Sequence, residues 1–234
     1  MPPVTNGQPG FTTRYWDCCK PHCGWKNNAS RPISSCDRNN GSLGGNYDAA
    51  SACNGGPAHM CWNYAPKANG DNIAYAFAAH NGVGCGTCFQ LEFTGESNNP
   101  KPETGHDLGS QSLKGRQMIV QVINTGGIQS GQFDLLVPGG GVGDFNACSS
   151  QWGTSDLGEQ YGGFFLACQQ QSNFDYAAGT ACASKWCDKV FAGKGELLSG
   201  CKWFVEWFGM ADNPKMKFTQ VTCPQQLSSI SGMQ

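Results

Sequence analysis

Charged side chains are scarce in this sequence of 234 residues. Asp, Glu, Lys and Arg together account for 14% of the chain, whereas an average soluble protein has about 25%. The 15 basic residues are nearly balanced by 17 acidic ones, and the net charge is −2. Because affinity for a phosphate backbone depends on clustered Lys and Arg, this balance excludes an electrostatic nucleic-acid binder.

Long hydrophobic segments and internal repeats are also missing. No apolar run approaches the roughly 18 residues that a membrane-spanning helix requires, so we expect no membrane partner. No repeat of about 20 to 50 residues is visible, which argues against a solenoid or a propeller. Residues 1–10 have neither the charged nor the apolar region of a signal peptide. We interpret them as a linker or an expression remnant, left after signal removal, ahead of a single domain over residues 11–234.

Cysteine, glycine and aromatic residues are abundant by contrast. The chain has 14 Cys, 33 Gly, 13 Phe, 7 Trp and 6 Tyr, and this much aromatic surface argues against disorder. An even number of cysteines spread along the chain predicts a disulfide framework and a secreted, extracellular protein. Cys85 and Cys88 could instead form a redox pair or half of a zinc site, but no second Cys or His pair accompanies them.

Short segments rich in β-branched and aromatic residues, bounded by Gly or Pro, predict strands. The clearest strands are expected at residues 117–123, 133–137, 202–208 and 215–222. Trp203 and Trp207 alternate in the third segment, and we expect both in the core. Helical spacing of apolar residues predicts a helix over 71–80. The polar stretch at 94–115 and the cysteine-containing stretch at 162–200 are expected to be long loops of the same domain.

The densest cluster of chemically active residues lies at 13–25, where Asp17 stands between an aromatic pair and two adjacent cysteines. Adjacent cysteines rarely bond to each other, so Cys18 and Cys19 should reach different partners and fix the backbone around Asp17. Aromatic rings cover the apolar faces of pyranose sugars, and a positioned carboxylate performs acid–base chemistry. The cluster therefore indicates a sugar site, with a structural aspartate in a cross-linked turn as the alternative.

Residues 13–21 read Thr-Arg-Tyr-Trp-Asp-Cys-Cys-Lys-Pro, and this stretch resembles the opening signature of glycoside hydrolase family 45, the small fungal-type endoglucanases. Similar segments continue along nearly the whole chain, at residues 132–135, 137–143, 160–163, 200–207, 211–214 and 220–224. The resemblance implies a mainly β catalytic domain: a six-stranded double-psi β-barrel with long disulfide-linked loops, a few short helices and an open groove. It also implies hydrolysis of internal β-1,4-glucosidic bonds with inversion of anomeric configuration.

By motif position, the resemblance puts the general base at Asp17 and the general acid at Asp134. Inverting glycosidases hold these two carboxyl groups about 6.5–9.5 Å apart, which leaves room for the attacking water. Apolar neighbours such as Phe133 and Leu135 should desolvate Asp134 and raise its pKa, so that it stays protonated. Asp17 should remain ionised, helped by the nearby Lys20.

Other residues are expected to hold the substrate, because they resemble residues of the family's groove. These substrate-binding candidates are Tyr15, Lys20, Trp25 and Tyr161. The glycine run at 139–141 lacks the following Lys and Ser or Thr of a phosphate loop, and close backbone approach beside the groove explains it better. The expected partner of this monomer is a β-1,4-glucan polysaccharide such as cellulose. No metal or cofactor is expected, since two carboxylates without histidine suit acid–base catalysis.

The resemblance further implies a disulfide pairing. It joins Cys18–Cys148, Cys19–Cys53, Cys23–Cys85, Cys36–Cys61, Cys88–Cys223 and Cys187–Cys201, with Cys168–Cys182 as an additional pair.

The chain departs from the family pattern at three places. Residues 125–128 read Thr-Gly-Gly-Ile, where the family often carries a further Asp, and Asp144 is the candidate replacement. Gln132 stands where His is common, and His22 where Ser is usual. The alternative function is a non-hydrolytic expansin- or barwin-like cell-wall or carbohydrate-binding protein, which would share the barrel but lack the Tyr-Trp-Asp-Cys-Cys motif.

Overall fold

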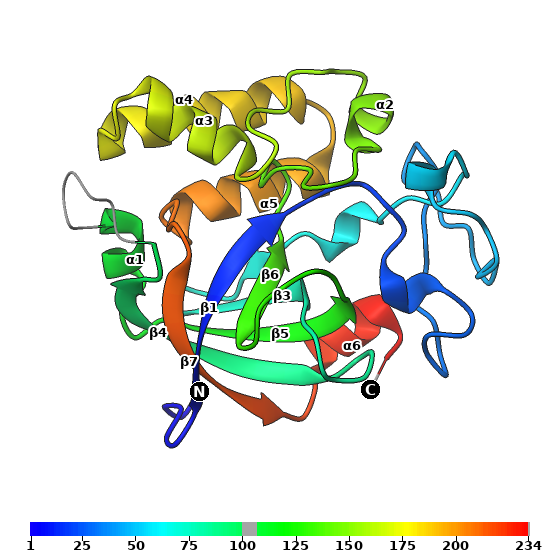
Figure 1. Ribbon diagram of the computed structural model, residues 1–234, viewed down its shortest axis with the longest axis horizontal. Helices are drawn as coiled ribbons and strands as arrows, with labels where there is room; N and C mark the ends of the chain where they lie inside the picture. Colours follow the sequence, from blue (N-terminus) through cyan, green and yellow to red (C-terminus); the bar gives the residue numbers. More distant parts are fainter. Residues whose placement is uncertain (100–106, 234) are drawn as a thin grey trace.

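The computed structural model describes residues 1–99 and 107–233. Its strands are β1 (Gln8–Tyr15), β2 (Lys67–Ala68), β3 (Ile73–Ala79), β4 (Cys88–Ser97), β5 (Gln117–Asn124), β6 (Gln132–Leu136) and β7 (Pro214–Val221). Its α-helices are α1 (Leu108–Ser112), α2 (Cys148–Trp152), α3 (Gly163–Gln171), α4 (Tyr176–Val190), α5 (Gly195–Glu206) and α6 (Gln225–Ser231). Short 3-10 helices span His22–Gly24, Ala52–Asn54 and Trp62–Tyr64. Helices α2 to α5 lie together on one side of the sheet (Figure 1).

The strands form one sheet that closes on itself. Their order is β2-β3-β5-β4-β7-β1-β6, and an additional pairing joins β6 back to β3. Six strands therefore make a ring, with the two-residue β2 attached outside it. The β1–β6 and β3–β5 pairs are parallel, and the other pairs are antiparallel. This confirms the mainly β fold class, as a ring-like sheet rather than a regular barrel.

Aromatic packing inside the ring anchors β6. The Phe133 ring lies 5.0 Å from Phe218 and 5.2 Å from Phe89 between centroids, and it stacks on His80 at 4.0 Å. Burial of each such side chain contributes about 1.5–3 kcal/mol to stability. Because side chains alternate along a strand, burying Phe133 and Leu135 directs Asp134 to the opposite side of β6.

The helix expected over residues 71–80 is wrong, because Ile73–Ala79 form β3. This strand pairs with β5 along its whole length, and with β2 and β6 at its two ends. Tertiary pairing of this kind overrides the helix propensity of the four alanines in the segment. The small side chains Ala74, Ala76 and Ala78 are all buried.

The strand expected at 202–208 is also wrong, because most of that segment belongs to α5. The Trp203 and Trp207 rings stack four residues apart at 5.4 Å, and Phe204 and Phe208 do the same at 5.1 Å. A helix that is apolar on most sides is buried, and such a sequence also satisfies the alternation of a strand. The prediction that Trp203 and Trp207 belong to the core is confirmed, at 5% and 8% exposure.

The two long loops that we expected differ from the prediction. Residues 162–200 are mostly helical, because α3, α4 and the start of α5 occupy them. Disulfides hold these helices together, with Cys168–Cys182 linking α3 to α4 and Cys187–Cys201 linking α4 to α5. In the segment 94–115, β4 continues to Ser97 and α1 begins at Leu108, while residues 100–106 lie outside the described residues.

All seven implied disulfides are present, which confirms the pairing and leaves no free cysteine. Cys85 and Cys88 are bonded to Cys23 and Cys223, so neither the redox pair nor the zinc site exists. Within residues 1–99 and 107–233, no helix has the length and apolar character to cross a membrane.

Residues before position 11 pack against the ring. The Val4 N–H donates to Glu92, Gln90 donates to the Pro2 carbonyl, and Gln8–Phe11 pair with β7. The domain boundary expected after residue 10 therefore falls inside β1.

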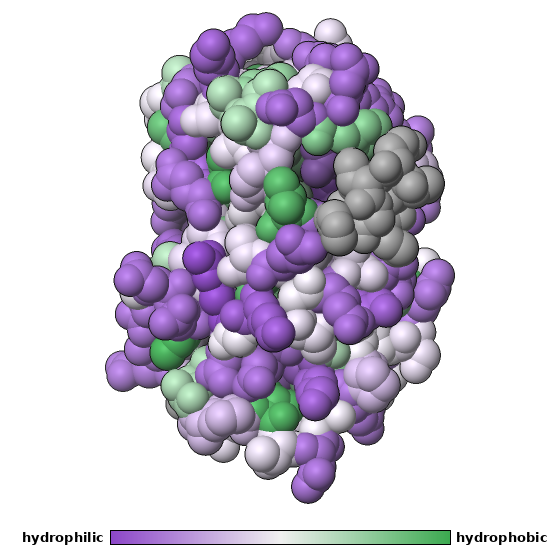
Figure 2. All heavy atoms as spheres, turned by 90° about the vertical axis from the view of Figure 1, so that its left-hand side faces the viewer, coloured by the Kyte–Doolittle hydropathy of each residue, from purple (hydrophilic) through white to green (hydrophobic). Residues whose placement is uncertain are grey.

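On the face drawn in Figure 2, hydrophobic residues appear in small separate groups among hydrophilic ones.

Candidate active site

A cleft of about 730 Å³ opens where β1 ends. Its lining includes every site residue predicted from the sequence: Tyr15, Asp17, Lys20, Trp25, Asp134 and Tyr161. These residues come from segments more than a hundred positions apart, and the β1–β6 pairing explains how they meet. Thr13 lies directly beside Asp134 in that register, so the two signature motifs are neighbours in the sheet.

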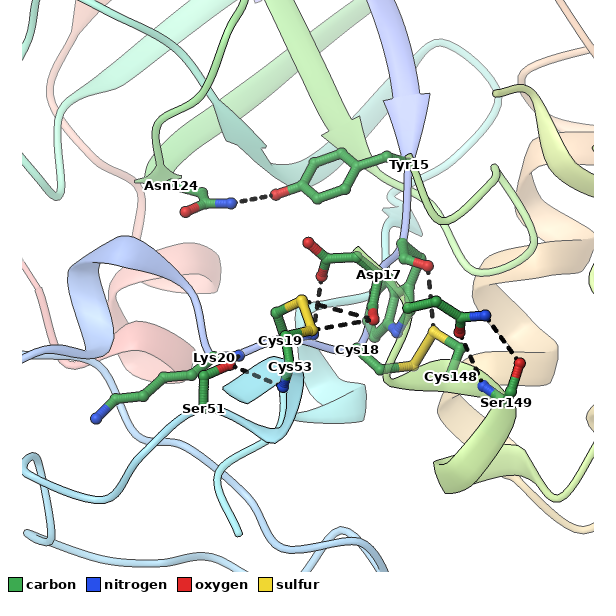
Figure 3. Close-up of a disulfide and its surroundings, with 12 residues drawn as sticks. Tyr15, Asp17, Cys18, Cys19, Lys20, Ser51, Cys53, Asn124, Cys148 and Ser149 are labelled. Carbon is green, nitrogen blue, oxygen red and sulfur yellow. Dashed lines mark hydrogen bonds between the residues drawn. A yellow bond between two sulfur atoms is a disulfide. The ribbon is translucent and has the colours of Figure 1, made fainter. Parts of the chain in front are cut away.

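Asp17 lies in a tightly fixed turn that follows β1, and it is only 8% exposed. Its carboxylate accepts a hydrogen bond of 2.8 Å from the Cys19 N–H, and its carbonyl accepts one from Ala147. Cys18 has a φ of 62°, a left-handed conformation that non-glycine residues seldom adopt. Figure 3 shows the Cys18–Cys148 and Cys19–Cys53 disulfides on either side of Asp17. The expectation that Cys18 and Cys19 reach different partners is confirmed.

Burial raises the pKa of Asp17 from 3.8 to about 6, and the Cys19 N–H opposes that rise. We expected Lys20 to help keep Asp17 ionised, but its ammonium contacts other groups. Its ammonium donates to the carbonyl oxygens of Tyr47 and Ala49, each at 2.8 Å, and lies 3.9 Å from the centre of the Trp25 ring. Lys20 therefore fixes the loop around residue 48 and the Trp25 ring, while the backbone supplies the hydrogen bond to Asp17.

Asp134 occupies the middle of β6 and is partly exposed to the cleft. Burial is the main cause that raises its pKa to about 7, and the negative charge of Asp17 raises it further. A 2.8 Å hydrogen bond from the Thr13 hydroxyl and the charge of Arg14 act in the opposite direction. The pKa of Asp134 thus lies above that of Asp17, in the order expected for an acid and a base.

Tyr15 is electrostatically coupled to both aspartates. Its pKa is raised well above 10, by burial and then by the charges of Asp17 and Asp134. The Asn124 amide donates to the Tyr15 hydroxyl at 2.7 Å (Figure 3). Tyr15 therefore stays a neutral hydroxyl that can hydrogen-bond to a ligand in the cleft.

The glycine run closely approaches the backbone just before Asp17, which agrees with the predicted close approach beside the groove. The Trp16 N–H donates to the Gly141 carbonyl at 2.8 Å, and a Cβ on Gly140 would lie 3.1 Å from the Tyr15 nitrogen. Gly139 and Gly141 have φ values of 85° and 104°, which glycine adopts without steric cost.

A further carboxylate, that of Asp144, lies at the outer part of the cleft. Tyr161 is 62% exposed, and its hydroxyl donates a short hydrogen bond to Asp144. Both residues line the cleft together with Phe145, which is 60% exposed. The sequence singled out Asp144 without placing it, and it did not single out Phe145.

Sequence reasoning missed an ion pair in the wall of the cleft. Arg14 and Asp212 are joined at 3.2 Å, with side-chain exposures of 5% and 10%. The Arg14 guanidinium also lies 5.2 Å from the centre of the Phe204 ring. Both charged residues belong to motifs that carried the resemblance, at 13–21 and 211–214. This membership was the signal in the sequence that could have pointed to the ion pair. Among the described residues, no three His, Cys, Asp or Glu side chains are grouped closely enough to hold a metal.

The comparisons with known proteins agree with one another. The family model described as Glycosyl hydrolase family 45 matches residues 9–234. Endoglucanase B of Cellvibrio japonicus is 48% identical over 244 residues, covering 100% of this chain, and the chain spans about half (47%) of its length. An endoglucanase of the springtail Cryptopygus antarcticus is 38% identical, over 97% of this chain and 89% of its own. The crystal structure of a cellulase from that springtail superimposes with a TM-score of 0.75 at 37% identity, covering 98% of this chain and 97% of the other.

Proposed function

The chain belongs to glycosyl hydrolase family 45, and on this basis we propose that it is an endo-β-1,4-glucanase. It hydrolyses internal bonds of cellulose and soluble β-glucans with inversion of anomeric configuration. The observation that carries the proposal is a pair of aspartates, Asp17 and Asp134, that line one cleft and whose desolvation raises their pKa values to about 6 and about 7. Such paired carboxyl groups are what inverting glycoside hydrolysis requires.

In this mechanism the two aspartates have separate tasks. Asp17, as the ionised base, removes a proton from a water that attacks the anomeric carbon from one face of the sugar. Asp134, as the protonated acid, gives its proton to the glycosidic oxygen that leaves from the other face. Because the pKa of Asp134 is raised more than that of Asp17, an ionised Asp17 can stand beside a protonated Asp134.

The remaining cleft residues bind the glucan. Tyr15 offers a hydroxyl in the cleft, while Trp25 and Tyr161 present aromatic rings to pyranose faces. Lys20 contributes by fixing the Trp25 ring. The hydrogen bond of Asp144 goes to Tyr161, and we therefore assign Asp144 to the orientation of that ring rather than to the attacking water.

The protein acts outside the cell, in keeping with its seven disulfides, and we propose that it acts there as a monomer. Its substrate carries no charge, which suits a chain with few charged residues.

A reducing-end assay on carboxymethyl-cellulose tests the function. The wild-type protein should release new ends, while Asp17→Asn and Asp134→Asn should each lower kcat by about 10²- to 10⁴-fold, the usual contribution of a general base or acid. Both variants should still bind insoluble cellulose. NMR of the first product should show the α-anomer.

Three results would contradict the proposal. A wild-type protein that binds cellulose without releasing ends would support the expansin-like alternative. A β-configured first product would exclude inversion, and full activity in either variant would remove its assigned role.

A further inference from the structure

A one-way chain of hydrogen bonds ends on Asp134. The Gln129 N–H donates to the Gln132 side-chain oxygen at 2.9 Å, which orients that amide. The Gln132 side-chain nitrogen then donates to the Thr13 hydroxyl oxygen at 2.8 Å. The Thr13 hydroxyl in turn donates to Oδ1 of Asp134, also at 2.8 Å.

The direction of this chain follows from the hydrogen inventory of its members. An amide nitrogen can only donate, and a hydroxyl has a single hydrogen. Since Gln132 directs a hydrogen at the Thr13 oxygen, Thr13 is left to donate its own hydrogen to Asp134. Oδ1 of Asp134 therefore acts as an acceptor, and the proton of the neutral acid resides on the other oxygen, Oδ2.

We propose that Gln132 is a positioning residue that acts through Thr13 to make Oδ2 of Asp134 the oxygen that delivers the catalytic proton. The inference rests on the proposed function and deepens it. When the Oδ2–H bond breaks and the proton passes to the leaving glycosidic oxygen, negative charge develops on Asp134. The Thr13 bond strengthens with that charge, so it stabilises the transition state more than the ground state.

The sequence had marked Gln132 only as a departure from the histidine common at this position. An amide does not titrate between pH 4 and 9, whereas histidine changes its charge and its donor pattern near pH 6.5. With Gln132, the direction of the chain is the same across the working pH range.

The other groups around Asp134 act on it in other ways than by fixing which of its oxygens accepts the Thr13 hydrogen. Arg14 and Asp17, from β1 and the turn after it, act on Asp134 through their charges, and Arg14 is also paired with Asp212. Tyr15 faces both aspartates and is bonded to Asn124. From the β3 side, His80 stacks on Phe133 and contacts the Gln132 carbonyl rather than its amide.

The decisive variant is Gln132→Glu, because a carboxylate accepts where the amide donates. Thr13 can then turn its hydrogen away from Asp134, and the alkaline limb of the kcat/KM profile should move to higher pH by about 0.5–1 unit, as expected for the loss of one hydrogen bond. The kcat at the optimum should fall several-fold with KM unchanged. Gln129→Glu is the matched control: its exposed side chain adds the same charge nearby, while its backbone N–H remains.

Two substitutions of Thr13 test the second link. Thr13→Val, which removes the hydroxyl at nearly constant volume, should shift the alkaline limb like Gln132→Glu, and Thr13→Ser should restore the wild-type profile. In the Thr13→Val background, Gln132→Glu should add no more than the shift given by Gln129→Glu. Equal shifts for Gln132→Glu and Gln129→Glu in the wild-type background would overturn the proposal, as would an unshifted profile in Thr13→Val.

A measurement without substrate separates this inference from the proposed function. Carbon-13 NMR of labelled aspartate follows the titration of Asp134 directly, and the same order of shifts among the variants is expected. If the wild-type protein released no sugar, the function would fail while this titration still decided the Gln132–Thr13 relation. Should Gln132→Glu not fold, Thr13→Val and Thr13→Ser carry the test by themselves.

Discussion

Two residues of one type behave differently in this site because their surroundings differ. Asp17 and Asp134 share the cleft and are both desolvated. Asp17 accepts a backbone N–H from a cross-linked turn, whereas Asp134 lies on an apolar strand and also experiences the charge of Asp17. The order of their pKa values thus comes from the elements that hold them.

The ionised site should lower the stability of the fold. The pKa of Asp134 is raised from 3.8 to about 7, so folding favours its neutral form. The stability that comes from this preference is complete below pH 4 and is lost as pH rises through 7. Asp134→Asn should therefore increase the free energy of unfolding at pH 8, by on the order of 2–4 kcal/mol.

Urea unfolding at pH 8 and pH 4 checks this prediction. The stabilisation of Asp134→Asn should appear at pH 8 and shrink at pH 4, where the wild-type carboxyl is already neutral. Asp144→Asn, at an exposed position, should change stability little at either pH. Equal stabilisation by Asp134→Asn at both pH values would contradict the assigned cause.

Single strands and helices show where local sequence patterns were sufficient to predict the secondary structure and where they were not. β5, β6 and β7 were predicted because their β-branched and aromatic residues stand between Gly and Pro. β3 and α5 were not predicted. Alanines at helical spacing also suit a crowded central strand such as β3. In α5, the spacing of Trp203 and Trp207 satisfies both the helical and the strand periodicity. Asp17 and Asp134 could be found from their motifs, but Thr13 as a partner of Asp134 depends on the β1–β6 register, which no local pattern contains.

β6 should be the strand whose packing matters most to the site. Phe133 is fully buried against Phe89, Phe218 and His80, so Phe133→Ala should cost about 3–5 kcal/mol of stability. Phe145→Ala, which truncates the same side chain at 60% exposure, should change stability by less than about 0.5 kcal/mol. Guanidinium unfolding measures both, and similar losses would refute the anchoring of β6 by Phe133.

At the scale of the whole molecule, two of the disulfides, Cys18–Cys148 and Cys19–Cys53, frame Asp17, and two others, Cys168–Cys182 and Cys187–Cys201, link helices α3, α4 and α5. Cys19–Cys53 closes a separation of 34 residues beside Asp17, and Cys168–Cys182 closes one of 14 between α3 and α4. Replacing either pair by serines should cost about 2–4 kcal/mol. Only loss of Cys19–Cys53 should lower kcat, by at least about tenfold, because it releases the turn that holds Asp17.

Steady-state kinetics well below the melting temperature of each variant separates the two effects. The Cys168→Ser/Cys182→Ser protein should keep kcat within about twofold of wild type while melting earlier. If both double variants lost activity in proportion to stability, the distinction between the two groups of disulfides would be wrong.

The closure of the ring also sets the order in which the molecule can form. β1 pairs with β6 and with β7, which follow it by more than a hundred and about two hundred residues. Contacts between such distant parts of a chain slow folding, because long loops must close before the pairing stabilises them. During synthesis, Asp17 emerges early but acquires its partner strands only after most of the chain has left the ribosome. The pair of aspartates in the cleft is therefore among the last parts of the protein to be completed.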